Sequence, residues 1–200
     1  MTSHVHKTPS PKKELSLGGL WECLTDPEDQ FEIETLPEKG WQHTLVPSNW
    51  NTATLKNYSG VVWYRTTFSI DEKSYHAARL KFFGVDYYAD AWLNNTHLGH
   101  HEGYFQSFDY LAHKHLKAGA NQLIVRVDSP WETPGIHGWP GRKRLLKGVL
   151  SHHDCRPGGS DPDKGQEENT GGIWNDVTLT LLGTCELDQP TITTTVQDNE

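Results

Sequence analysis

Cysteine is scarce in this sequence, and its spacing excludes several classes of protein. The three cysteines, Cys23, Cys155 and Cys185, are odd in number and far apart. They form neither the disulfide framework of a small secreted domain nor the paired spacing of a zinc ribbon. Unpaired thiols fit a reducing compartment, so we expect a cytoplasmic protein.

Long apolar runs and an excess of basic residues are also missing. No stretch approaches the roughly 20 apolar residues that a membrane-spanning helix needs, and residues 1–20 lack the apolar centre of an export signal. The chain has 26 acidic and 18 basic residues, and the basic cluster Arg142–Arg144 is short. We therefore expect neither a membrane anchor nor a nucleic-acid partner, because nucleic-acid binding requires a basic face.

Familiar catalytic and cofactor motifs are absent too. The glycine pairs Gly158–Gly159 and Gly171–Gly172 lack the strand–helix frame of a phosphate or dinucleotide site, and no serine triad is evident. We expect no cofactor. Two groups of potential metal ligands, His100–Glu102 and His152–Cys155, match no standard zinc spacing. We interpret them as hydrogen-bonded histidines and predict no metal site.

The residues that are abundant favour short strands and tight turns. The chain holds 18 glycines, 11 prolines and 8 tryptophans, and large rings let a core form from few side chains. Several segments alternate between polar and apolar residues, as half-buried strands do. The clearest are Val61–Ile70, Asn121–Val127 and Val177–Leu182, and the further candidates are Gly18–Cys23, Trp41–Val46, Ala78–Phe83, Tyr88–Leu93, Thr96–Gly99 and Gln106–Asp109.

This pattern predicts an all-β fold built from two antiparallel sheets, a β-sandwich of the jelly-roll type. Asn94–Asn95 suits a two-residue hairpin turn because asparagine tolerates a positive φ. We expect a flexible N-terminal tail over residues 1–14 and the sandwich over 15–183. Residues 184–200 then form a linker and the start of a following domain. Within the sandwich, the long loop at 130–170 is the first place to look for a binding site.

Several ordered motifs resemble one family of enzymes. They are Gly84–Asn95 (GVDYYADAWLNN), Leu98–Phe105 (LGHHEGYF) and Thr170–Val177 (TGGIWNDV), with shorter matches at Leu17–Trp21, Val46–Trp50 and Trp63–Arg65. Together they resemble the N-terminal sugar-binding domain of family 2 glycoside hydrolases, the β-galactosidases, β-glucuronidases and β-mannosidases. The resemblance extends over about residues 15–182. It implies a galactose-binding-like jelly roll that helps to hold a carbohydrate substrate, with the downstream domains of the same enzyme as partners.

The resemblance also implies that this chain lacks the catalytic machinery. Glycoside hydrolysis needs two carboxyl groups about 5–5.5 Å apart for retention or about 6.5–9.5 Å apart for inversion. In the family both are glutamates of a barrel domain that follows this one. We interpret Glu167–Glu168 as solvated, and Asn199–Glu200 as a chance match to the family's Asn-Glu dipeptide. The chain alone is therefore expected to be inactive.

The long loop carries the candidate substrate-binding residues. They are Trp131, Trp139, Arg142, Lys143, His153 and Asp154. In the β-mannosidase branch an Arg-Lys pair precedes a Trp-Asp pair, and the pairs here are Arg142–Lys143 and His153–Asp154. In β-galactosidases and β-glucuronidases the aspartate lies just before the closing motif, where this chain has Gln166–Glu168. Both alignments of the aspartate stay open.

Seven of the eight tryptophans divide into two groups. We expect Trp21, Trp63, Trp92 and Trp174 to be core or interface rings. For Trp50, Trp131 and Trp139, a core position and a position facing a sugar or a neighbouring domain both stay open. Two other functions remain open beside the glycosidase domain: a free-standing lectin-like module, and a structural interaction domain whose exposed rings pack on another chain.

Overall fold

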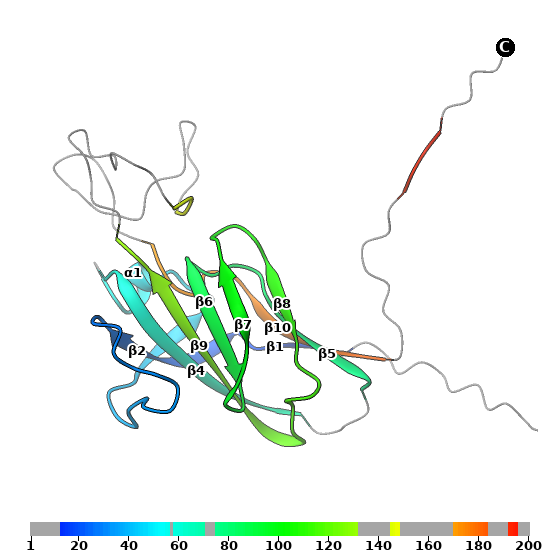
Figure 1. The fold of residues 1–200 in the computed structure, drawn as a ribbon, viewed down its shortest axis with the longest axis horizontal. Helices are drawn as coiled ribbons and strands as arrows, with labels where there is room; N and C mark the ends of the chain where they lie inside the picture. Colours follow the sequence, from blue (N-terminus) through cyan, green and yellow to red (C-terminus); the bar gives the residue numbers. More distant parts are fainter. Residues whose placement is uncertain are drawn as a thin grey trace, which may run out of the picture.

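The protein is a two-layered β-sandwich, which confirms the predicted fold class (Figure 1). The computed structural model describes residues 13–56, 58–70, 75–131, 145–148, 170–183 and 192–195. Within them, one sheet has the order β1-β10-β5-β8 and the other has the order β3-β2-β4-β9-β6-β7, with antiparallel pairing throughout. No helix in the described ranges is long and apolar enough to cross a bilayer.

The elements of the two sheets are short to medium in length. The four-stranded sheet contains β1 (Lys13–Ser16), β10 (Val177–Leu182), β5 (Ala77–Phe82) and β8 (Phe108–Leu111). The six-stranded sheet contains β3 (Gln42–Val46), β2 (Gly19–Asp26), β4 (Gly60–Ile70), β9 (Gly119–Ser129), β6 (Tyr88–Leu93) and β7 (Thr96–Glu102). One short helix, α1 (Trp50–Ala53), follows β3.

The alternating segments form the predicted strands, and the asparagine pair forms the predicted turn. Asn94 and Asn95 have φ values of 50° and 66°, and they join β6 to β7. The Asn94 side chain also accepts a hydrogen bond from the Gln122 backbone amide at 3.0 Å and donates one to Asn121 Oδ1 at 2.8 Å. The hairpin is thereby fastened to the start of β9. β1 was not predicted; its backbone pairs along β10, with Leu15 opposite Leu179.

The main core lies between the two sheets. Alternate residues of β4, including Val62 and Tyr64, point into it, and the buried rings of Trp21 and Phe82 fill much of its volume. The Trp21 indole N–H donates to the Leu17 carbonyl at 2.8 Å, which satisfies its one polar atom. The core therefore combines a few large rings with many aliphatic side chains.

A second, smaller cluster covers the outer face of the six-stranded sheet. Trp63 is buried there with Leu24, Val61 and Ile124. Partly buried side chains of the β2–β3 connection and of β6 pack over them: Phe31, Ile33, Leu36, Trp41 and Trp92. The prediction of core rings is thus confirmed for Trp63, but on the opposite face of the sheet from Trp21.

For Trp50, the structure decides between the two open alternatives. Trp50 is fully buried at the start of α1, and its ring meets Tyr58 edge-on with centroids 5.6 Å apart. It cannot face a sugar or a neighbouring domain. The reason is local: the Asn49 side chain caps α1 by accepting from the Asn51 backbone amide, and the resulting turn brings Trp50 against the 170–173 segment.

Candidate functional site

Several chain segments end together at one rim of the sandwich. The register places Gly60 at the start of β4 opposite Ser129 at the end of β9, and Asp128 opposite Tyr88 at the start of β6. Glu102, at the end of β7, lies opposite Tyr88. Figure 1 shows α1 and the end of β9 at this same end of the molecule. The segment predicted as the long loop therefore starts at this rim.

The chain returns to the rim through the closing motif. Gly171 O accepts from the Trp50 amide at 3.0 Å, and Gly172 O accepts from the Asp86 amide at 3.0 Å. A Cβ atom on Gly171 would lie 1.9 Å from the Trp50 indole, and one on Gly172 would lie 2.8 Å from the Tyr64 hydroxyl. Only glycine fits at these two positions, so the motif Gly171–Gly172 serves close packing at the rim.

A hollow of about 330 Å³ opens at this rim. It is lined by Tyr87, Glu102, Gly103, Tyr104, Phe105, Gln106 and Leu146. Tyr104 stacks on Trp174 with centroids 4.7 Å apart and meets Phe105 at 4.6 Å. Phe105 is 44% exposed. Exposed rings beside carboxylate and amide groups suit a sugar, whose apolar C–H face stacks on rings while its hydroxyls form hydrogen bonds.

The surroundings of Tyr87 in the hollow favour its neutral form. Burial raises the pKa of the Tyr87 phenol, the negative charge of Glu102 raises it further, and a hydrogen bond with the Leu146 backbone acts in the opposite direction. Tyr87 therefore keeps its proton near neutral pH. The same hydrogen bond holds residues 145–148 against the wall of the hollow.

A buried ion pair lies beneath the hollow, next to Leu146. Asp86 and Lys147 are both fully buried, and Lys147 Nζ is 3.3 Å from Asp86 Oδ1. Lys147 also donates to Ser129 Oγ at 2.5 Å and to the Pro130 carbonyl at 3.3 Å. The Ser129 hydroxyl lies 3.1 Å from Asp86 Oδ1 and 2.8 Å from the Thr170 carbonyl.

Burial and charge act in opposite directions on Asp86. Burial raises the pKa of its carboxyl group, while Lys147 and the hydroxyls of Thr170 and Ser129 lower it by favouring the ionised form. The net shift of the Asp86 pKa is upward, so the effect of burial exceeds that of the partners. Without these partners the ionised form of Asp86 would be still less favourable. We name these four residues, Asp86, Ser129, Lys147 and Thr170, the buried node.

Of the six candidate substrate-binding residues, the structure describes one. Trp131 is 43% exposed and immediately follows β9 and Pro130 at the rim. Trp139, Arg142, Lys143, His153 and Asp154 lie outside the described residues, as do Gln166–Glu168 and Asn199–Glu200. Their roles remain predictions.

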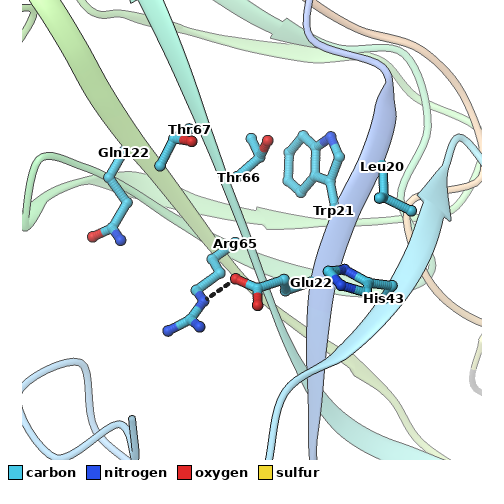
Figure 2. A pocket seen from close by; sticks show the side chains of 8 residues that line it. All are labelled: Leu20, Trp21, Glu22, His43, Arg65, Thr66, Thr67 and Gln122. Carbon is cyan, nitrogen blue, oxygen red and sulfur yellow. Dashed lines mark hydrogen bonds and ion pairs between the residues drawn. The ribbon is translucent and has the colours of Figure 1, made fainter. Parts of the chain in front are cut away.

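A second hollow, of about 270 Å³, lies on the six-stranded sheet where β2 separates from β4 (Figure 2). Its centre is an ion pair between Arg65 Nε and Glu22 Oε2 at 2.6 Å, and this hydrogen bond lowers the pKa of Glu22. Arg65 also lies 4.1 Å from the centroid of the Trp41 ring. The two charged side chains at its centre are already paired with each other, so the rim is the better candidate site.

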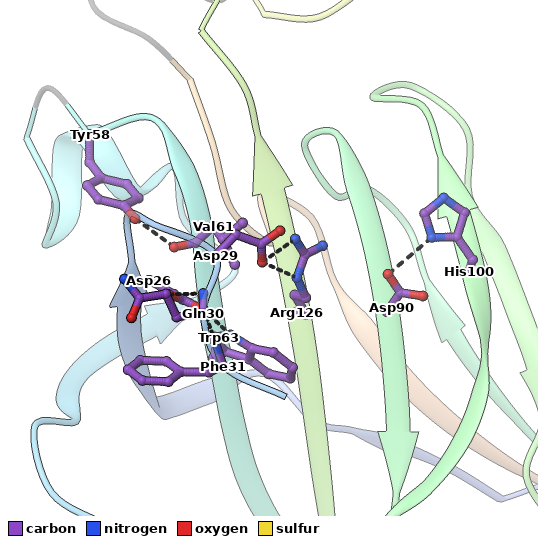
Figure 3. Close-up of polar contacts among 10 residues, drawn as sticks. All are labelled: Asp26, Asp29, Gln30, Phe31, Tyr58, Val61, Trp63, Asp90, His100 and Arg126. Carbon is purple, nitrogen blue, oxygen red and sulfur yellow. Dashed lines mark hydrogen bonds and ion pairs between the residues drawn. The ribbon is translucent and has the colours of Figure 1, made fainter. Parts of the chain in front are cut away.

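The histidines of β7 contact side chains of β6 and β8. His100 Nδ1 lies 3.1 Å from Asp90 Oδ2 (Figure 3). His97 Nε2 lies 3.1 Å from Asp90 Oδ1. The His101 ring stacks on Phe108 with centroids 3.9 Å apart. In the part of the chain that the structure describes, no three potential metal ligands come together. His152–Cys155 lies outside that part.

Sequence reasoning missed the buried node and the wall of the hollow. Asp86 stands between apolar residues just before a strand, and Lys147 lies in a segment without alternation. An acidic residue flanked by Val85 and Tyr87 was the available signal, because a carboxylate in such surroundings needs a partner. Tyr104 and Phe105 follow directly after β7, where exposed rings frequently line sites.

Comparison with known proteins identifies the family. Residues 27–138 match the family model described as glycosyl hydrolases family 2, sugar binding domain. The chain belongs to this family. The match includes β3 through β9, the rings at 104–105 and the first part of the long segment, but not Leu146 or Gly171–Gly172.

Relatives of this family 2 domain are much longer proteins. A putative β-glucuronidase of Formosa agariphila is 28% identical over an alignment of 145 residues that covers 66% of this chain and 14% of that protein. A β-galactosidase of Thermoanaerobacter pseudethanolicus is 30% identical over an alignment of 108 residues that covers 51% of this chain and 14% of that protein. The chain thus spans about one seventh of these relatives.

Solved structures agree on the fold. The crystal structure of Ruminococcus gnavus β-glucuronidase matches with a TM-score of 0.62 and 19% identity, over 86% of this chain and 29% of that one. A β-glucuronidase from an uncultured Clostridium matches with a TM-score of 0.63 and 21% identity, over 92% of this chain and 31% of that one. At this level of identity the likeness concerns the fold alone.

Proposed function

We propose that this domain binds the sugar of a β-glycoside at its rim, as the non-catalytic part of a family 2 glycosidase. The observation that carries the proposal is the aromatic hollow beside Leu146. It lies where the chain enters and leaves the segment with the candidate residues Arg142, Lys143, His153 and Asp154. The names of the relatives favour a β-glucuronide or a β-galactoside as the substrate.

Bond cleavage is assigned to another part of the enzyme. Hydrolysis needs an acid and a second carboxylate on opposite sides of the scissile bond. At the rim, Asp86 is fully buried against Lys147, and the neighbouring Glu102 belongs to the wall of the hollow. Asp86 cannot reach a glycosidic oxygen from its buried position. The catalytic glutamates are therefore proposed to lie in a barrel domain outside this chain.

Further domains of the same enzyme are the second proposed partner. Leu20 and Leu45 lie directly opposite each other on β2 and β3, and both are largely exposed. Adjacent exposed leucines favour an interface. Because the chain spans only 29% of one solved relative, the remaining domains are the proposed cover for this pair.

The state of the cysteine thiols bears on the cellular compartment of the protein. Cys23 is a free, buried cysteine, and burial raises the pKa of its thiol to about 11. A free thiol inside the core supports a reducing compartment, and we propose the cytoplasm.

The test of sugar binding compares two exposed apolar residues. We expect the chain to bind phenyl β-glucuronide or phenyl β-galactoside weakly, with a Kd on the order of millimolar, because the hollow is open on one side. Phe105→Ala is expected to weaken this binding about 5- to 10-fold by removing a stacking ring. Isothermal titration calorimetry of both proteins measures the difference.

The matched control is Leu111→Ala, because Leu111 is 59% exposed but lies on β8 in the other sheet. This variant should bind the glycosides as the unmodified chain does. Equal affinities for the Phe105 and Leu111 variants would show that the hollow does not bind the sugar. An absence of binding heat for every glycoside would contradict sugar binding by this chain.

A further inference from the structure

Glu102 places a carboxylate in the wall of the hollow at the rim. It ends β7, is exposed to solvent, and lines the hollow together with Phe105 and Gln106. Among the described residues, no lysine, arginine or histidine forms an ion pair with Glu102, in contrast to Asp86 nearby. Its charge is therefore open to a molecule that enters the hollow.

Asp128 adds a second negative charge beside Glu102. Tyr88 lies opposite Glu102 on one side and opposite Asp128 on the other, so the three side chains leave the sheet on the same face. Burial is the main cause that raises the pKa values of Tyr87 and Tyr88, and the charge of Glu102 is the next cause for both. The negative charge thus acts on the wall of the hollow itself.

The cations described near this wall are already neutralised. Lys147 follows Leu146 of the wall, but its side chain is fully buried and its Nζ lies 3.3 Å from Asp86 Oδ1. Arg126 of β9 pairs with Asp29, at 2.7 Å between Nη2 and Oδ1. None of the described residues that line the hollow is basic. A ligand therefore meets an unpaired carboxylate at this wall without a matching positive charge.

Neutral sugars and uronic acids differ in what they offer to such a wall. The hydroxyls of a neutral sugar can donate to a carboxylate, and hydrogen bonds to an ionised acceptor are about twice as strong as neutral ones. The carboxylate of a uronic acid can only accept, so it adds repulsion and no donor. In water, the repulsion between two unit charges about 4 Å apart corresponds to about fivefold in affinity.

We propose that Glu102 is a specificity-determining residue through which the hollow selects neutral glycosides over glycosides of uronic acids. The inference rests on the proposed function, because it names the class of sugar that the same hollow takes. Of the two proposed substrates, it favours the β-galactoside over the β-glucuronide. Glu102 accepts from a sugar hydroxyl in this scheme, and Asp128 adds to the selection through its charge.

Two pairs of ligands that differ only at C6 test the selection. They are phenyl β-galactoside with phenyl β-galacturonide, and phenyl β-glucoside with phenyl β-glucuronide. Isothermal titration calorimetry at low ionic strength is expected to give a Kd about fivefold lower for the neutral member of a pair. At about 1 M salt the ratio should fall below about twofold, because the Debye length shrinks to about 3 Å. A ratio that salt leaves unchanged would overturn selection by charge.

Glu102→Gln tests the residue, since it removes the charge and keeps the size of the side chain. The ratio of Kd values in this variant should fall to within about twofold, mainly because the uronide binds more tightly. Glu14→Gln is the matched control. It changes the net charge equally at an exposed glutamate of β1 in the other sheet, and it should keep the ratio of the unmodified chain.

The outcomes separate this inference from the proposed function. An unchanged ratio in Glu102→Gln, or tighter binding of the uronides by the unmodified chain, would overturn the selection while sugar binding by the chain stands. An absence of binding heat with all four glycosides would contradict the proposed function, and the selection with it.

Discussion

Trp63→Ala is expected to destabilise the domain by about 3–5 kcal/mol, the usual cost of removing a buried tryptophan. Trp63 is buried on the outer face of the six-stranded sheet, and its ring centroid lies 5.4 Å from that of Trp92. Its indole N–H donates to Asp26 Oδ2 at 3.2 Å (Figure 3). The substitution therefore removes packing and also takes one donor from a buried carboxylate.

The contacts of Asp26 explain why the effect should extend beyond the cavity. Asp26 accepts from the backbone amides of Gln30 and Phe31, both at 2.9 Å, and so shapes the connection that covers Trp63. Losing Trp63 loosens this cover and its apolar side chains, Phe31 among them. Urea denaturation followed by far-ultraviolet circular dichroism measures the change in the free energy of unfolding.

Trp131→Ala is the matched control for this experiment, since Trp131 is 43% exposed at the rim. Its effect on the free energy of unfolding should stay within about 0.5 kcal/mol. If Trp63→Ala also changed stability by less than about 1 kcal/mol, the outer cluster would not be a second core.

Gly171→Ala is expected to destabilise the domain by about 3 kcal/mol, at the upper end for an overpacked core. The added Cβ would lie 1.9 Å from Trp50 Cε2 and 2.0 Å from Cζ2, and Trp50 is fully buried. Neither the indole nor the backbone hydrogen bond from the Trp50 amide to Gly171 O at 3.0 Å can move freely. The expected destabilisation therefore comes from a steric clash, and this clash lies at the base of the candidate site.

A double-mutant cycle with Trp50→Ala checks this cause. Trp50→Ala alone should cost about 3–5 kcal/mol, but Gly171→Ala should add little in its presence because the clash is gone. Gly19→Ala is the comparison for backbone strain without a clash, since Gly19 has φ +131° and nothing within 4 Å of the added Cβ. Additive costs for Gly171 and Trp50 would contradict the steric explanation.

Local sequence patterns predicted most of the fold because each strand carries its own signal. The alternation in Val61–Ile70 corresponds to the two faces of β4. Val62 and Tyr64 point into the core between the sheets, and Trp63 points into the cluster on the outer face. Asn94–Asn95 reports its turn through the conformational freedom of asparagine. β1 was missed because its four residues are stabilised by pairing with β10, more than a hundred positions away, and not by a local pattern.

The candidate site was less predictable because its contacts join distant segments. Trp50 is buried against Gly171, which is far away in the sequence, so no local pattern indicates its burial. Likewise, Asp86 and Lys147 look like ordinary charged residues until the fold buries both. The loop residues Arg142, Lys143, His153 and Asp154 were selected through family resemblance, and they remain predictions.

Sugar binding and glycoside cleavage by this chain can be followed together in one sample. Isotope-labelled chain is titrated with phenyl β-glucuronide or phenyl β-galactoside, and amide chemical shifts and the integrity of the glycoside are followed in the same sample by nuclear magnetic resonance. If the rim binds sugar without cleaving it, the amide shifts of Tyr87, residues 102–106 and Leu146 should change. The shifts of the Asn94–Asn95 hairpin should stay constant, and the glycoside should remain intact. Shifts confined to the Glu22–Arg65 hollow, or release of phenol by this chain, would contradict the account.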